Sequence, residues 1–112
     1  MSPTYAPDLA HAIISTIPSL VTNNNASNLY HYAGDPPCSW ADLAENIFET
    51  AYKLNRINKK IPVNRITSDK YNTLAKRPKN SVLDSSAFFE AYNIKASDWK
   101  RGIKDALVNK NI

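Results

Sequence analysis

The sequence predicts a small, helix-rich α/β domain of about four helices and two or three short strands, formed by residues 1–112 as a single unit. Its 112 residues, 43% apolar and 21% charged, have the composition of an ordinary globular domain, which at this length should bury roughly two-thirds of its unfolded surface. Apolar residues recur at helical spacing in four segments, and two short segments between them favour strands. Because two short strands make a poor sheet, either further strands are hidden in loops or the domain completes a larger structure.

The first helix should follow Thr4, whose hydroxyl can cap it, with Pro7 and Asp8 in the first turn. Apolar residues then recur at helical spacing, at Leu9, Ile13, Ile17 and Leu20. Pro18 has no N–H to donate, so the helix is predicted to end or kink there, before a polar loop over residues 22–28.

A short strand is predicted over residues 29–33, closed by a turn at the Gly-Asp-Pro-Pro run, residues 34–37. Ser39 should open the second helix, because Asp42 lies at capping-box spacing from it. One apolar stripe follows, formed by Trp40, Leu43, Ile47, Ala51 and Leu54.

A second strand is predicted over residues 61–67, which are rich in β-branched side chains, and residues 68–81 should form a loop. Ser85 or Ser86 can cap a short third helix, and Ser97 a last one. The large aromatic residues at helical spacing are assigned to the core, namely Trp40, Phe88, Phe89 and Trp99.

The charge and cysteine content exclude several classes of protein. A net charge of +4, in short basic clusters that do not repeat along one element, gives little support to nucleic-acid binding. No apolar run approaches the roughly 18 residues that cross a bilayer, and Cys38 alone can form neither an internal disulfide nor a thiolate metal cluster. No metal site is expected, and a reducing cytoplasm suits the chain.

The motifs of a cofactor-dependent reductase are missing from these residues. With only Gly34 and Gly102, far apart, no glycine-rich dinucleotide turn can be written. None of the six tyrosines has a lysine one helical turn later, where an ammonium would lower the pKa of the phenol. No catalytic or cofactor-binding residue is therefore predicted.

Residues 75–81 (AKRPKNS) combine the guanidinium fork of Arg77, a rigid proline and the short polar side chains of Asn80 and Ser81. Such a loop can hold a diphosphate, although the same residues would also suit a charged surface turn. The chemistry of this segment leaves both interpretations open.

The segment over residues 75–84 (AKRPKNSVLD) resembles the C-terminal signature of dTDP-4-dehydrorhamnose reductases, which belong to the extended short-chain dehydrogenase/reductase superfamily. Four further segments resemble this family in the same order, over residues 2–10, 29–34, 39–44 and 99–103. The chain departs from the family at Asn72 and Leu74, where prolines are common.

The resemblance implies the C-terminal substrate-binding part of a reductase that converts dTDP-4-dehydro-L-rhamnose to dTDP-L-rhamnose with NADPH or NADH. It implies that the N-terminal dinucleotide-binding domain lies outside these residues and that the fragment is catalytically silent and binds no cofactor. Arg77, Asn80 and Ser81 are the expected substrate-binding residues, with Thr4 and Tyr5 as a second tier. The expected partners are the dTDP-sugar and the missing domain.

Two alternatives remain at this stage. The first is a stand-alone interaction or regulatory module of the same fold without the chemistry, and the second is a basic nucleic-acid binder, supported only by the net charge. A surface left open by the missing domain would also allow self-association.

Overall fold

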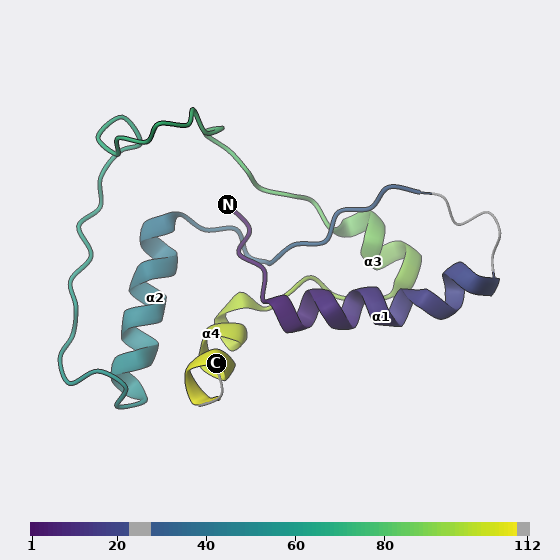
Figure 1. Cartoon of the computed structure of the whole chain (residues 1–112), viewed down its shortest axis with the longest axis horizontal. Coiled ribbons are helices and arrows are strands. Elements are labelled where there is room, and N and C mark those ends of the chain that lie inside the picture. Colours follow the sequence, from purple (N-terminus) through teal and green to yellow (C-terminus); the bar gives the residue numbers. More distant parts are fainter. Residues whose placement is uncertain (23–27, 110–112) are drawn as a thin grey trace.

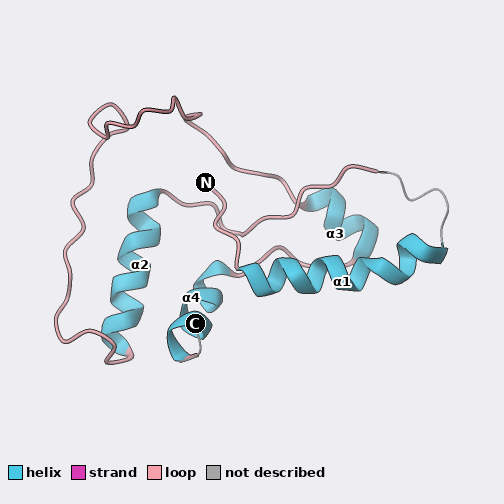
Figure 2. Ribbon diagram, in the orientation of Figure 1, coloured by secondary structure: helices cyan, strands magenta, loops and turns pink. Residues whose placement is uncertain are grey.

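The computed structural model describes residues 1–22 and 28–109, which contain four helices: α1 (Ala6–Thr22), α2 (Trp40–Lys53), α3 (Ser86–Tyr92) and α4 (Trp99–Val108). Figure 1 shows α1 along the long axis, α3 beside it, and α2 and α4 together near its start. Figure 2 shows that long loops connect α1 to α2 and α2 to α3. The prediction of four helices is confirmed. The prediction of two or three short strands is wrong, because the described residues contain only an isolated parallel bridge between Gly34 and Ser97.

Residues 29–33 are extended but have no neighbouring strand in the described part of the chain. Backbone groups at the end of the segment bond elsewhere: Ala33 N–H donates to Ser85 Oγ (2.9 Å), and Ala33 O accepts from Ser97 N–H (3.1 Å). The rings of Tyr30 and Tyr32 both lie edge-on to Phe88. The alternation that predicted a strand is therefore present, but β-propensity reports packing on a sheet that these residues do not build.

The second predicted strand, residues 61–67, is a largely exposed connection beside α2. Arg65 ties it down, donating to Asp42 (2.7 Å) and to Glu45 (2.5 and 3.0 Å) on the first turns of α2. This segment forms no backbone pairing with another strand in the described part of the chain, so the strand prediction is wrong here too.

Helix α1 differs from its prediction at its start, and it does not end at Pro18. Thr4 does not cap it, because Thr4 Oγ1 instead accepts from Gly34 N–H (3.1 Å), although Pro7 and Asp8 do occupy the first turn. The helix also runs on past Pro18 to Thr22, whose hydroxyl donates to the Pro18 carbonyl (2.9 Å). Of the loop predicted over residues 22–28, positions 23–27 lie outside the described residues.

The predicted caps of the other three helices have different outcomes. The Ser39–Asp42 capping box is confirmed, with Asp42 N–H donating to Ser39 Oγ (3.0 Å) and Ser39 N–H to Asp42 Oδ2 (2.8 Å). Ser85 precedes α3 but makes no side-chain cap, and α4 is capped by Asp98, not by Ser97. Ser85 and Ser97 are used for contacts between distant segments instead.

The core is small. The buried apolar residues of the described chain are Ala12, Ala33, Ala51, Phe88 and Trp99. The core assignments of Phe88 and Trp99 are confirmed, whereas those of Trp40 (72% exposed) and Phe89 (42% exposed) are wrong. Both lie on helix faces that no other described element covers.

The chain is more open than a compact domain of its size. Its radius of gyration is 17.2 Å, against about 13 Å for a compact domain of this length. Its accessible surface is 8980 Å², against roughly 6,200 Å² for a folded monomer of this mass. About half of the unfolded surface is buried, and not the expected two-thirds.

The Asp42 carboxylate should make stability depend on pH in strong acid. The Ser39 backbone N–H, then the Ser39 hydroxyl and Arg65, hold the pKa of Asp42 far below its usual range. A lowered pKa stabilises the fold above the unfolded value of about 3.9, and the stabilisation is lost as the pH falls through the folded pKa. We expect Asp42→Asn to be less stable than wild type at pH 7, with the difference shrinking below about pH 4.

Urea midpoints at neutral and acid pH measure this effect. Glu90→Gln is the control, because Glu90 forms no ion pair within the described residues. A constant difference between Asp42→Asn and wild type across the pH range would contradict the assignment.

Candidate functional site

Ser97 is the polar centre of the molecule, with only 1% of its surface exposed. Its hydroxyl oxygen accepts from Tyr5 N–H (3.0 Å), and its O–H donates to Asp8 Oδ2 (2.7 Å). One serine therefore joins the segment before α1, the first turn of α1 and the start of α4. This arrangement sets the positions of Thr4 and Tyr5.

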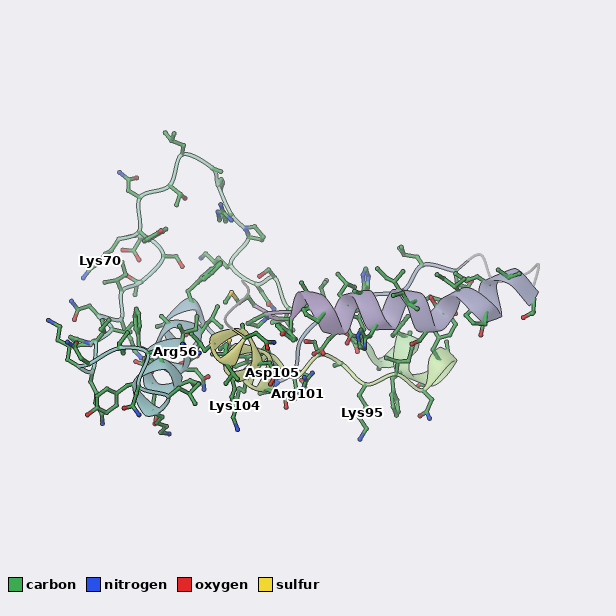
Figure 3. The ribbon with its side chains drawn as sticks, turned by 60° about the horizontal axis from the view of Figure 1, so that its bottom comes forward. Arg56, Lys70, Lys95, Arg101, Lys104 and Asp105 are labelled. Atoms are coloured by element: carbon green, nitrogen blue, oxygen red, sulfur yellow. The ribbon has the colours of Figure 1, made fainter. Side chains whose placement is uncertain are left out.

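Arg101 of α4 extends the network across the start of α1. It bonds Asp8 Oδ1 at 2.5 Å and Asp105 Oδ2 at 2.7 Å, and its guanidinium carbon lies 5.9 Å from the centre of the Tyr5 ring. The hydrogen bond with Asp8 raises the pKa of Arg101. Figure 3 shows Arg101 and Asp105 close together on α4, near α1. Tyr5 is thus held by backbone, ring and charge contacts.

An open depression of about 520 Å³ lies beside this network. Its lining is drawn from α1 and its approach, and from α4 and the residue that follows it: Tyr5, Pro7, Asp8, His11, Arg101, Lys104, Asp105, Val108 and Asn109. Arg101 already pairs with both carboxylates of the depression, Asp8 and Asp105. Lys104 is therefore the one cation in the lining that has no ion-pair partner among the described residues. The depression offers little to an anion with several charges.

The cations of the chain are concentrated elsewhere, on the long loop over residues 55–85. This loop carries eight Lys and Arg against two Asp, a net charge of +6, while the other residues carry six against eight, a net charge of −2. Of these eight, only Arg65 forms an ion pair within the described chain. The loop is therefore a strongly positive segment on an otherwise slightly acidic molecule, which favours anionic ligands.

Arg77, Asn80 and Ser81 are all exposed on this loop. Asn80 Oδ1 accepts from Val82 N–H (3.0 Å), which turns the chain just after Lys79. Figure 1 shows the loop leaving the far end of α2, arching away from the helices and returning to α3. Because Arg77 is exposed and forms no ion pair within the described residues, its donors can meet a ligand.

The two groups of predicted site residues are linked only at the end of the loop. Leu83 N–H donates to Ser2 Oγ (3.4 Å), two residues before Thr4. No hydrogen bond joins Arg77, Asn80 or Ser81 to Thr4 or Tyr5 within the described residues, and Thr4 uses its hydroxyl internally, with Gly34 and with Ser2 O (3.2 Å). The Ser2–Leu83 bond is the joint between the end of the loop and the segment before α1.

Sequence reasoning missed the joining role of Ser97 and Asp8, which it assigned to a cap and to a first-turn charge. Ser97 lies 92 residues along the chain from Tyr5 and 89 residues from Asp8, so no local pattern reveals these contacts. A weak signal existed for Arg101, which lies inside one of the segments that resemble the reductase family.

The described residues contain no group of three His, Cys, Asp or Glu side chains placed to hold a metal ion. None of the described helices is long and apolar enough to cross a membrane. The distinctive surface features are the strongly positive loop over residues 55–85 (the basic loop) and the segment before α1 that carries Thr4 and Tyr5.

These features define a ligand-binding type of domain, and comparison with known families agrees. Residues 1–112 match the family described as RmlD substrate binding domain, and the chain belongs to that family.

The chain is similar to the dTDP-4-dehydrorhamnose reductase of Aggregatibacter actinomycetemcomitans, with 38% identity over 105 residues, 92% of this chain and 35% of the relative. It is 30% identical over 109 residues to the enzyme of that name from Escherichia coli K12, covering 95% of this chain and 36% of the relative. The spore coat polysaccharide biosynthesis protein SpsK of Bacillus subtilis is 27% identical over 110 residues, covering 98% and 34%. The chain spans about a third of the length of these relatives.

Proposed function

We propose that this chain is the sugar-nucleotide binding portion of an NAD(P)H-dependent reductase that acts on dTDP-4-dehydro-L-rhamnose in the synthesis of dTDP-L-rhamnose. The observation that carries the proposal is the exposed loop of net charge +6 on an otherwise slightly acidic domain. A nucleoside diphosphate sugar carries its charge on the diphosphate, which such a loop can bind. The names of the relatives support the choice of sugar.

Arg77 supplies the planar fork that matches two phosphate oxygens, and Asn80 and Ser81 supply neutral donors three and four residues further along the loop. Thr4 and Tyr5 would meet the ligand when the loop closes at the Ser2–Leu83 joint. The network of Ser97, Asp8 and Arg101 holds that second tier in place before the ligand arrives.

The dinucleotide, NADPH or NADH, is assigned to the part of the relatives that this chain does not span. The chain alone is accordingly proposed to be silent, and the working protein to act in the cytoplasm, where reduced nicotinamide is available. Adding NADPH and the keto-sugar nucleotide to the isolated chain should leave the absorbance at the nicotinamide band unchanged. Turnover by the isolated chain would contradict this assignment.

Arg77→Ala tests the binding role. The host is a chimera in which this chain replaces the matching third of the Aggregatibacter relative. We expect the KM for the sugar nucleotide to rise about ten- to a hundredfold, the effect of losing a hydrogen-bonded charge pair worth roughly 1.5–3 kcal/mol. The unfolding free energy should stay within about 0.5 kcal/mol, because Arg77 is exposed and forms no ion pair within the described residues.

Two further variants sharpen this measurement. Arg77→Lys keeps the charge without the fork and should fall between wild type and Arg77→Ala. Lys95→Ala removes a cation from the α3–α4 connection, labelled in Figure 3, and should leave the KM unchanged. Equal KM values for wild type and Arg77→Ala, or equal losses from Arg77→Ala and Lys95→Ala, would argue against a specific diphosphate contact.

A further inference from the structure

Helix α1 carries an apolar face that nothing in the described chain covers. Six large aliphatic side chains on it are between 39% and 74% exposed: Leu9, Ile13, Ile14, Ile17, Leu20 and Val21. At 100° per residue they fall in one stripe about 140° wide. The small residues Ala12 and Thr16 point inward and are buried, and His11 and Ser15 lie on the polar side. A surface helix normally hides its apolar stripe, whereas α1 hides only the edge of it.

The exposed stripe is part of a larger deficit of buried surface. The chain exposes roughly 2,800 Å² more than a compact monomer of its mass. That excess is larger than the roughly 600–1,500 Å² of a usual interface between domains. Apolar side chains on other elements contribute to it, among them Leu29 (87% exposed) and Trp40 (72%). The missing contact must therefore be extensive.

We propose that the apolar face of α1 is the docking surface for the part of the full-length protein that this chain does not span. This proposal rests on the proposed function, in which the chain is one portion of a longer reductase. The relatives are about three times as long as the chain, so the remaining part is about twice its size and can cover faces on several elements. A second copy packed through α1 alone would cover one helix and leave Trp40 exposed.

The docking face and the basic loop are on separate elements. In Figure 1, α1 extends along the long axis away from the end where the loop arches over α2. Domain docking and nucleotide binding can therefore fail independently.

The test compares the isolated chain with the chimera described above, both carrying Cys38→Ser. Ile17→Cys places a thiol on the apolar face, and Ser15→Cys places the matched control on the polar side of the same helix. We expect maleimide to label residue 17 at least about tenfold more slowly in the chimera than in the isolated chain, because docking removes it from solvent. Residue 15 should be labelled at similar rates in both.

Equal labelling of residue 17 in both proteins would overturn the proposal. So would slow labelling of residue 17 in the isolated chain that becomes fast on dilution, because it would assign the face to a second copy. As a second measurement, Ile17→Asp should lower the Tm of the chimera well below that of Ser15→Asp, and equal Tm values would place the docking face elsewhere.

The labelling is done without nucleotide, so it separates the two proposals. A chimera that protects residue 17 and yet does not bind the sugar nucleotide would overturn the proposed function alone.

Discussion

Gly34→Ala should destabilise the chain by at least about 3 kcal/mol, a large effect for a single added methyl group. A Cβ at this position would lie 1.6 Å from the carbonyl oxygen of Pro3 and 2.7 Å from its carbon. These are backbone atoms, so no side-chain rotation can relieve the overlap. The segment before α1 would have to move, and with it the bond from Gly34 N–H to Thr4 Oγ1. The glycine is required by close approach, since its φ is not positive.

Gly102→Ala is the matched control for this substitution. Its Cβ would lie 2.6 Å from Cγ of Tyr5 and 2.7 Å from Cβ of the same residue, a smaller overlap than the 1.6 Å approach at Gly34, although the Tyr5 Cβ moves only with its backbone. We expect a loss of about 1–2 kcal/mol. Urea unfolding of the three proteins measures both values. Wild-type stability in Gly34→Ala, or a larger loss in Gly102→Ala, would contradict the packing described here.

The helices could be predicted because their signals are local. The start of the second helix is predicted by Ser39 and Asp42, which lie three residues apart. Both hydrogen bonds of that capping box form as expected. Thr4 and Ser97 carry the same kind of signal, yet each bonds a residue far along the chain. A hydroxyl can cap a helix or join two segments, and only the folded arrangement decides between these uses.

The strands failed for a different reason. Residues 29–33 have the alternation of a strand and pack the rings of Tyr30 and Tyr32 against Phe88, but pairing requires a neighbouring strand. The sequence indicated either that further strands were hidden in loops or that the domain completes a larger structure, and the described residues contain no further strand. The open shape and the exposed face of α1 agree with the second alternative.

The two parts of the candidate site were predictable to different degrees. The chemistry of Arg77, Asn80 and Ser81 is legible in the sequence, because a polar loop between helices must be exposed. The clustering of positive charge on one loop could also have been counted from the sequence. The buried Ser97 network could not, because burial depends on contacts between residues about 90 positions apart.

Trp99→Ala should cost about 3–5 kcal/mol, the usual loss when a buried aromatic side chain leaves a cavity. The indole is 4% exposed, and its Nε1–H donates to the Pro36 carbonyl (2.8 Å), so truncation also leaves that carbonyl without its donor. Trp40→Ala is the same chemical change at a side chain that is 72% exposed, and in the isolated chain it should cost within about 0.5 kcal/mol.

Urea unfolding of the two alanine variants therefore separates the two tryptophans, which the sequence placed together in the core. Trp99→Phe should fall in between, because it keeps most of the packing and loses the hydrogen bond to Pro36. Equal losses from Trp99→Ala and Trp40→Ala in the isolated chain would mean that Trp40 is covered in solution. In the chimera, the cost of Trp40→Ala should rise only if the docked part reaches α2, so this one control also measures how far the covered surface extends beyond α1.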